Sequence, residues 1–207
     1  KAVGVSAKVI RADLYNTADV MTTIANAYQL NIKEIEKLQD WFYITVREGK
    51  AQGQDLARTL GLVISSASEA GVSLNELGAA IAVLSRTQSV SQSMIGLNQM
   101  LNAFIKPTLQ AQAAARKWGI EISATALQEK GLTNILTELN QKVGGNVEAL
   151  EKMFGNIRAG RAILSLTGKQ FHNYLNVLNE YDIGAGAGME AFEKQIDTVQ
   201  NAYERLQ

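Results

Sequence analysis

The sequence predicts an all-α protein, a compact multi-helix domain of short antiparallel helices followed by an amphipathic or coiled-coil-like helix. Apolar residues recur at spacings of three and four along most of the chain, and strict apolar–polar alternation is nearly absent. Proline occurs once, whereas 17 glycines divide the chain into short stretches. Because 46% of the 207 residues are hydrophobic, the chain can bury a sizeable core.

The first third of the chain predicts three helices. Asn16 or Thr17 is suited to cap the first, since short polar side chains accept the free N–H groups of a first helical turn. Asn31 is suited to cap the second for the same reason. The third helix is predicted over residues 54–69, where leucine, valine and isoleucine form one apolar stripe.

The middle third predicts three more helices, separated by clear turn signals. Gly71 can adopt the left-handed conformation that ends a helix, and Ser73 with Glu76 forms a capping-box pattern that begins the next. Two apolar helices follow within residues 74–105. Pro107 suits the first turn of a sixth helix, where its missing N–H costs little, and this helix is predicted to end near Gly119.

After this helix the predicted pieces become shorter and are divided by glycines. They cover residues 124–129, 132–143, 147–154 and 157–166. Many short helices favour a compact body over one long rod.

The C-terminal part of the chain has a different pattern. A Gly/Ala segment at residues 183–189 is typical of a flexible hinge, with a membrane-perturbing segment as the alternative. The helix after it carries apolar residues at alternating spacings of four and three, which suits either the start of a coiled coil or a helix docked on the domain: Phe192, Ile196, Val199, Tyr203 and Leu206. We therefore expect a helical core domain at 1–182, a hinge at 183–189 and an amphipathic helix at 190–207.

The composition excludes several classes of function. Twenty basic and twenty acidic residues balance, so net charge gives no argument for nucleic-acid binding. The absence of cysteine excludes disulfides, and a single histidine, His172, excludes any metal site that needs two imidazoles. The long uncharged run at residues 87–105 contains too many Asn, Gln and Ser residues for a membrane span, and no signal peptide is recognisable.

Candidate catalytic residues are few, and each has a simpler structural interpretation. Carboxylates at Glu34, Glu121 and Glu148 do not form an acid–base pair that the sequence places together. The densest aromatic cluster, at Trp41 and Phe42, suits a core anchor or a subunit contact better than a sugar platform. We therefore expect no enzymatic activity, no metal and no cofactor.

Over about residues 15–168 the order and spacing of the turn and core residues resemble the globular core of phage tail tape measure proteins. The stretch from Ala67 to Thr108 carries most of this resemblance, and Ser89–Ser93 departs from the Gly-rich turn of many family members. The matching residues have structural roles: Gly53, Asp55, Leu56, Gly71, Val72, Leu74, Leu77, Leu84, Leu101, Pro107, Gly119, Gly131, Phe154 and Gly155.

This resemblance implies a structural protein of the virion tail that is made in the host cytoplasm. Its implied roles are tail assembly, tail-length determination and, in a complete protein, DNA ejection. The implied partners are further copies of the chain, with a trimer as the expected state, together with the tail tube, tail tip or baseplate proteins and assembly chaperones. A tail-associated peptidoglycan hydrolase and an unrelated helical adaptor are the alternatives.

Overall fold

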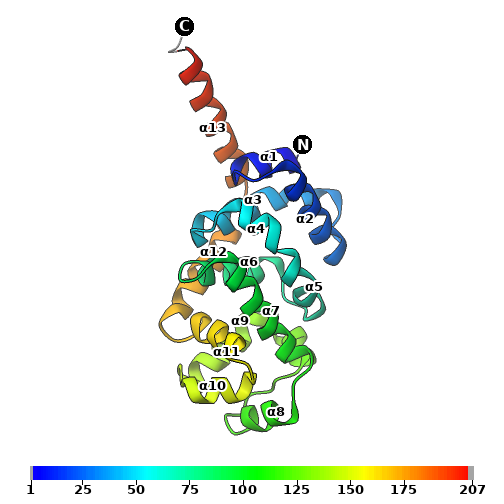
Figure 1. Cartoon of the computed structure of the whole chain (residues 1–207), viewed down its shortest axis with the longest axis vertical. Coiled ribbons are helices and arrows are strands. Elements are labelled where there is room, and N and C mark those ends of the chain that lie inside the picture. The colour runs from blue at the N-terminus through cyan, green and yellow to red at the C-terminus, as the bar shows by residue number, and fades with distance from the viewer. Residues whose placement is uncertain (1, 205–207) are drawn as a thin grey trace.

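A computed structural model describes the backbone of residues 2–204 and the side chains of residues 2–198. In this part of the chain there are thirteen α-helices, one 3₁₀ helix and no strand, which confirms the all-α prediction. The helices pack into an elongated body, and the last helix projects beyond one end of it (Figure 1).

Short connections join the helices. The first six are α1 (Ala2–Val9), α2 (Leu14–Ala27), α3 (Ile32–Gly49), α4 (Gly53–Thr59), α5 (Gly61–Glu69) and α6 (Leu74–Ser85). They are followed by α7 (Val90–Ile105), α8 (Leu109–Arg116), α9 (Ala124–Val143), α10 (Val147–Phe154) and α11 (Ile157–Leu166). The 3₁₀ helix η1 (Gly168–Gln170) leads into α12 (Phe171–Ile183), and α13 (Ala187–Glu204) ends the described chain.

Helix α6 forms the centre of the core. Every residue from Leu77 to Leu84 is buried, as expected for a helix that is apolar on all sides. Helices α3, α7, α11 and α12 pack around it. At Gly78 an added Cβ would overlap the hydroxyl of Tyr181 on α12 and lie 2.8 Å from Nε1 of Trp41 on α3. Gly78 therefore allows two neighbouring helices to come close to α6.

Local signals in the sequence correctly predicted several helix boundaries. The side chain of Asn31 accepts the N–H of Glu34, whose carboxylate accepts the N–H of Asn31, so a capping box begins α3. Ser73 and Glu76 form the same box at α6. Gly71, with φ of 72°, adopts the predicted left-handed conformation between α5 and α6.

The predicted start of the first long helix was wrong. Asp13 caps α2, because its carboxylate accepts the N–H of Asn16 at 3.0 Å, and neither Asn16 nor Thr17 is the cap. The hydroxyl of Thr17 instead donates to the carbonyl of Asp13 at 2.7 Å. The preceding helix α1 was not predicted, since eight residues give too short a periodic pattern to recognise.

Two other boundaries also differ from the prediction. The stretch at 54–69 forms two helices, α4 and α5, which meet at Leu60. The carbonyl of Leu60 accepts the N–H groups of both Val63 and Ile64, so the first turn of α5 is tightened. Pro107 lies outside α8, since the next residue, Thr108, is the N-cap and its hydroxyl accepts the N–H of Ala111 at 3.1 Å.

The breaks predicted at glycines further along the chain are present. Gly131 has φ of 78° and ψ of 161°, so α9 consists of two helical segments joined at a kink. Helices α10 and α11 cover the predicted ranges, with the left-handed Gly155 between them. Glycine tolerates these backbone angles because it has no Cβ.

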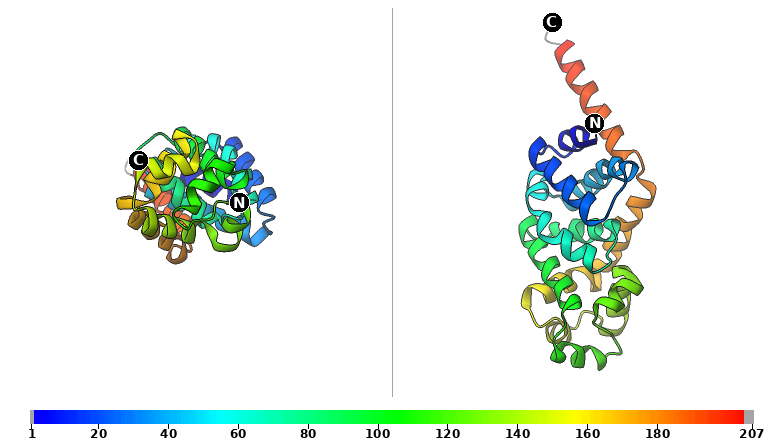
Figure 2. Two further views of the ribbon diagram at one scale, coloured as in Figure 1. Left: turned by 90° about the horizontal axis from the view of Figure 1, so that it is seen from below. Right: turned by 90° about the vertical axis from the view of Figure 1, so that its right-hand side faces the viewer.

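The body has two distinct ends. Helices α1 and α13 meet at one end, and α8 and α10 form the other (Figures 1 and 2). The side-chain amide of Gln195 on α13 donates to the carbonyl of Val9 on α1 at 3.5 Å. The described chain therefore begins and ends at the same end of the body.

Alkaline pH is expected to unfold the body. Burial raises the pKa of Tyr28, Tyr174 and Tyr181, and the charge of Glu76 raises the pKa of the first two further. The stability that these neutral phenols contribute is complete below about pH 10, the ordinary tyrosine pKa, and is lost as the pH rises above it. In a spectrophotometric titration their tyrosinate absorbance should appear together with the loss of helical circular dichroism. Ionisation of all six tyrosines in the chain before helicity falls would contradict this expectation.

Candidate functional site

The residues that carry the family resemblance have structural positions in the body. Gly71, Gly119, Gly131 and Gly155 have positive φ angles and form turns. Gly53 lies against Ile10 directly after α1, Asp55 is exposed in the first turn of α4, and Pro107 precedes the cap of α8. The remaining apolar members are buried or half-buried: Leu56, Val72, Leu74, Leu77, Leu84, Leu101 and Phe154. They explain the fold, and they do not converge on a reactive cluster.

Glu76 joins three helices. Besides its capping box with Ser73, its Oε1 accepts both the N–H and the hydroxyl of Thr133 on α9, each at 2.8 Å. That hydroxyl also lies 3.0 Å from the hydroxyl of Tyr174 on α12. Gly131 leaves room for this arrangement, because a Cβ there would lie 3.2 Å from the same carboxylate oxygen.

Trp41 and Phe42 are buried in the core of the described chain, and their role as oligomer or partner contacts stays a prediction. Phe42 has no exposed surface and Trp41 is 4% exposed. Their rings meet edge to face with centroids 5.2 Å apart, and Nε1 of Trp41 donates to the carbonyl of Leu74 at 2.7 Å. This packing agrees with the interpretation of the pair as a core anchor.

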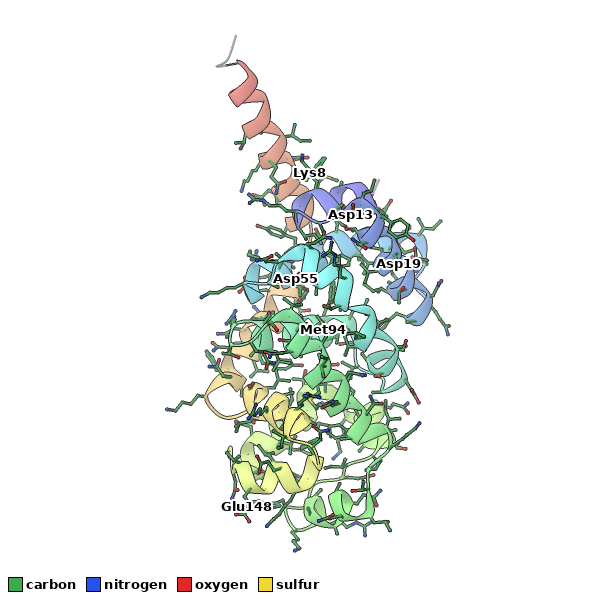
Figure 3. The ribbon with its side chains drawn as sticks, viewed as in Figure 1. Lys8, Asp13, Asp19, Asp55, Met94 and Glu148 are labelled. Atoms are coloured by element: carbon green, nitrogen blue, oxygen red, sulfur yellow. The ribbon has the colours of Figure 1, made fainter. Side chains whose placement is uncertain are left out.

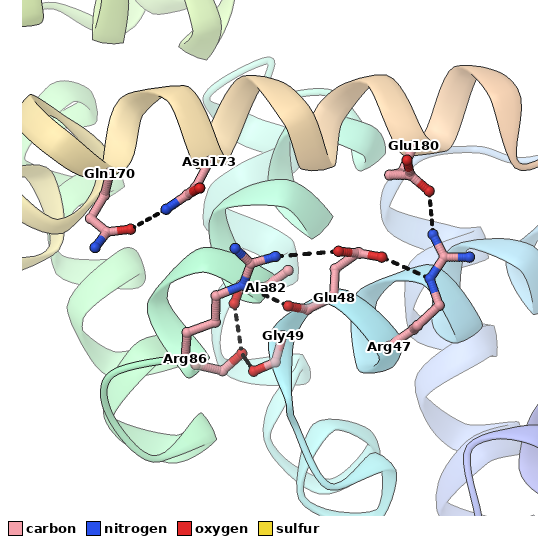
Figure 4. A network of polar contacts seen from close by, with 9 residues as sticks. Arg47, Glu48, Gly49, Ala82, Arg86, Gln170, Asn173 and Glu180 are labelled. Atoms are coloured by element: carbon pink, nitrogen blue, oxygen red, sulfur yellow. Dashed lines mark hydrogen bonds and ion pairs between the residues drawn. The ribbon is translucent and has the colours of Figure 1, made fainter.

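A chain of charged groups connects α3, α6 and α12 (Figure 4). Arg47 donates to Glu48 at 2.7 Å and also to Glu180, while Arg86 donates to the carbonyl of Glu48 at 2.7 Å and to its carboxylate at 3.3 Å. All four side chains are partly exposed, and ion pairs at such positions contribute little to stability. This network positions the helices rather than forming a reactive site.

The turn between α12 and α13 and the first two residues of α13, together residues 184–188, are named the elbow. The carboxylate of Asp40 on α3 accepts the N–H of Gly186 at 2.9 Å and the N–H of Gly188 at 2.8 Å. An added Cβ at Gly188 would lie 2.8 Å from the carbonyl oxygen of Gln39. The glycines therefore allow α13 to begin in direct contact with α3. The division of the chain into a core domain at 1–182, a hinge at 183–189 and an amphipathic helix at 190–207 stays a prediction.

Replacing Asp40 by alanine should loosen the elbow. The amides of Gly186 and Gly188 would lose their shared acceptor, so their hydrogen exchange should become at least about tenfold faster, corresponding to a loss of about 1.4 kcal/mol in local stability. Exchange followed by mass spectrometry or NMR measures this. Asp182→Ala is the matched control, because Asp182 is exposed in the last turn of α12, and equal protection in both variants would contradict the role of Asp40.

A groove of about 880 Å³ lies between α1 and α13 and is named the α1–α13 groove. Small apolar residues of α1 form its floor, and Lys8, Arg11 and Lys194 lie along it. Lys8 is labelled near the base of α13 in Figure 3. None of the residues that line the groove is acidic. They are Gly4, Ala7, Lys8, Arg11, Ala12, Leu14, Lys194, Gln195 and Thr198.

Helix α13 carries the predicted heptad pattern only in part within the described side chains. Phe192 packs partly buried against the core, and Ile196 is 39% exposed. Val199 and Tyr203 lie on the helix, but their side chains are outside the described residues, as is all of Leu206. The choice between a docked helix and a coiled coil therefore stays open, although the first turns of α13 contact α1 and α3.

Glu148, one of the carboxylates considered for acid–base chemistry, does not have the raised pKa of a general acid. Glu148 is exposed at the end opposite α13 (Figure 3). A hydrogen bond from Lys152 lowers its pKa, whereas a general acid needs a raised pKa. His172 is exposed on α12. In the part of the chain that the structure describes, no three His, Asp or Glu side chains are grouped to hold a metal ion.

Among the described helices, none is long and apolar enough to cross a bilayer. The sequence alone did not identify the elbow contact or the α1–α13 groove. Asp40 was noted only as the neighbour of an aromatic cluster, and α1 was not predicted. Both features join residues more than 140 positions apart, so no local pattern could have brought them together.

Comparison with known proteins gives a consistent result. Residues 1–155 match the protein family described as phage-related minor tail protein. The chain is 25% identical over 180 residues to a "Probable tape measure protein" of Clostridium phage phiCD119, an alignment that covers 82% of this chain and 19% of that protein. The chain thus spans about a fifth of the length of this relative. No solved structure matches the chain.

Proposed function

Because the chain belongs to the family of phage-related minor tail proteins, we propose that it is a folded structural segment of a tail tape measure protein. The relative's name supports the tape measure assignment, and that relative is about five times longer than the part aligned here. The segment would act by position and contact, with tail-length determination carried by helical portions of a complete protein.

The observation that best supports this proposal is the direction of α13. The helix begins in contact with α3 through the elbow and then leaves the body along its long axis (Figure 1). A helix that continued in this direction would add 1.5 Å of length for each residue. The body would then form a base from which a helical ruler extends.

The partners of a complete protein follow from the same proposal. We infer contacts with the tail tube, tail tip or baseplate proteins and assembly chaperones, and a homo-oligomer, with a trimer as the expected state. The location would be the virion tail after assembly in the host cytoplasm, and a role in DNA ejection would belong to the complete protein. The polar groups at Glu76, at Arg47 and at the elbow join helices to one another, which agrees with a structural role.

The test is a change in the length of the chain directly after α13. An in-frame insertion of 28 helical residues at this point in the complete phage gene should lengthen the tail by about 42 Å, as measured by electron microscopy. The control places the same insertion in the turn between α9 and α10, which lies within the body, where it should leave tail length unchanged. Equal tail lengths in both phages would overturn the proposal.

A further inference from the structure

Two cationic side chains of the α1–α13 groove form no ion pair within the part of the chain whose side chains the structure describes. Lys194 pairs with Glu190 one turn earlier on its own helix, at 2.6 Å. Lys8 and Arg11 are exposed, and neither has an ion pair among the described side chains. The groove is therefore both basic and apolar.

The floor of this groove is open to another chain. A Cβ added at Gly4 would have no atom within 4 Å, and Leu14 at the groove is 59% exposed. Small residues allow a second helix to approach closely, and an exposed leucine gives it apolar surface to cover. The groove thus fits a helix that is apolar in part and acidic in part.

Helix α13 itself carries a face that is partly acidic and partly apolar, on a side that does not line the groove. At 100° per residue, Ile196 lies about 160° around the helix from the groove residues Lys194 and Thr198, and Glu193 and Asp197 lie on the arc between Ile196 and Lys194. Glu193 and Asp197 are exposed and have no ion pair among the described side chains, and Ile196 is 39% exposed. One helix therefore presents an acidic–apolar face, named the α13 outer face, and borders a basic–apolar groove.

We propose that the α13 outer face of one copy of this chain docks in the α1–α13 groove of the next copy. Charge complementarity supports this partner, since two acids of the face match two cations of the groove. The contact joins two different surfaces, so it is heterologous and can close into a ring around the α13 helices. This inference deepens the proposed function and rests on it, because the docking needs several copies of the chain to assemble in one tail.

The first test uses cross-linking, which the natural absence of cysteine makes clean. Gly4→Cys places a thiol on the groove floor, and Ile196→Cys places one on the outer face. A short bis-maleimide should join the two single variants to each other when they are mixed, and should join neither variant to itself. Gly61→Cys replaces Gly4→Cys in the control, since Gly61 also has open space around its Cβ but lies outside the groove.

Each result has a defined meaning. A cross-link between the Gly4→Cys and Ile196→Cys chains, without one between the Gly61→Cys and Ile196→Cys chains, supports the proposed contact. Cross-linking of Ile196→Cys to itself indicates a symmetric contact and overturns it, as does the absence of any cross-link. If cross-links fail while the helical insertion after α13 still lengthens the tail, the docking inference fails and the proposed function stands.

A second test exchanges charges across the contact. Lys8→Glu alone should weaken self-association by at least about tenfold in sedimentation velocity, because it places like charges opposite each other. Asp197→Lys alone should do the same. The chain with both substitutions should regain most of the association, and both side chains are exposed, so folding should not change. Equal association of all three variants would overturn the proposal.

Discussion

Replacing Gly53 by alanine should lower the free energy of unfolding by about 3 kcal/mol. An added Cβ would overlap the carbonyl oxygen of Ile10 and would lie 2.6 Å from its Cβ and 2.9 Å from its carbonyl carbon. Two of these atoms belong to the backbone, which cannot rotate away as the end of a side chain can. The whole connection between α1 and α2 would have to move, and α4 would lose its contact with it.

Gly61→Ala is the matched control for this variant. Gly61 lies eight positions further on and begins α5, and nothing lies within 4 Å of its Cβ position. Alanine there should be neutral or slightly stabilising, by up to about 1 kcal/mol, because it restricts the unfolded chain. Urea denaturation followed by circular dichroism measures both variants, and equal stabilities would show that the space at Gly53 is not limiting.

Replacing Glu76 by alanine should also cost about 3 kcal/mol. Its carboxylate accepts hydrogen bonds from Ser73 at the start of α6 and from Thr133 after the kink in α9. Without it, the N–H and hydroxyl of Thr133 lose a charged acceptor in a partly buried place. The hydroxyl of Tyr174 would keep only a partner whose own position is no longer fixed.

Glu34→Ala separates the loss of a helix cap from the loss of the hydrogen bonds to Thr133. Glu34 forms the same capping box with Asn31 at the start of α3, but its side chain is exposed, and no described hydrogen bond links it to another helix. Its loss should cost only about 1 kcal/mol, the usual value of a cap. Similar losses for the two glutamates in urea denaturation would mean that the link to Thr133 contributes nothing.

Comparison of these two capping boxes indicates how much of the fold the sequence could predict. Both boxes could be predicted because the four residues involved are close in sequence, and the same holds for the turns at Gly71 and Gly155. The bonds from Glu76 to Thr133 could not, since 57 positions separate the two residues. Local chemistry sets where helices begin and end, and long-range contacts decide which side chains meet.

The candidate site was less predictable than the fold. The apolar pattern of α13 was recognised, but its relation to α1 depends on the elbow, where Asp40 binds amides that are 146 and 148 positions away. Glycine-rich composition suggested freedom of movement there. In the folded chain the same glycines allow contact with α3, because only a residue without a Cβ fits beside Gln39.

The position of both ends of the described chain at one end of the body has a mechanical consequence. Tension applied between α1 and α13 would pass through the contact between these helices and through the elbow. Helices α8 and α10, at the far end, would carry almost no load. Under a pulling force α13 should peel from α1 before the core at α6 is disturbed, so the chain would lengthen under load while most of the body stays folded.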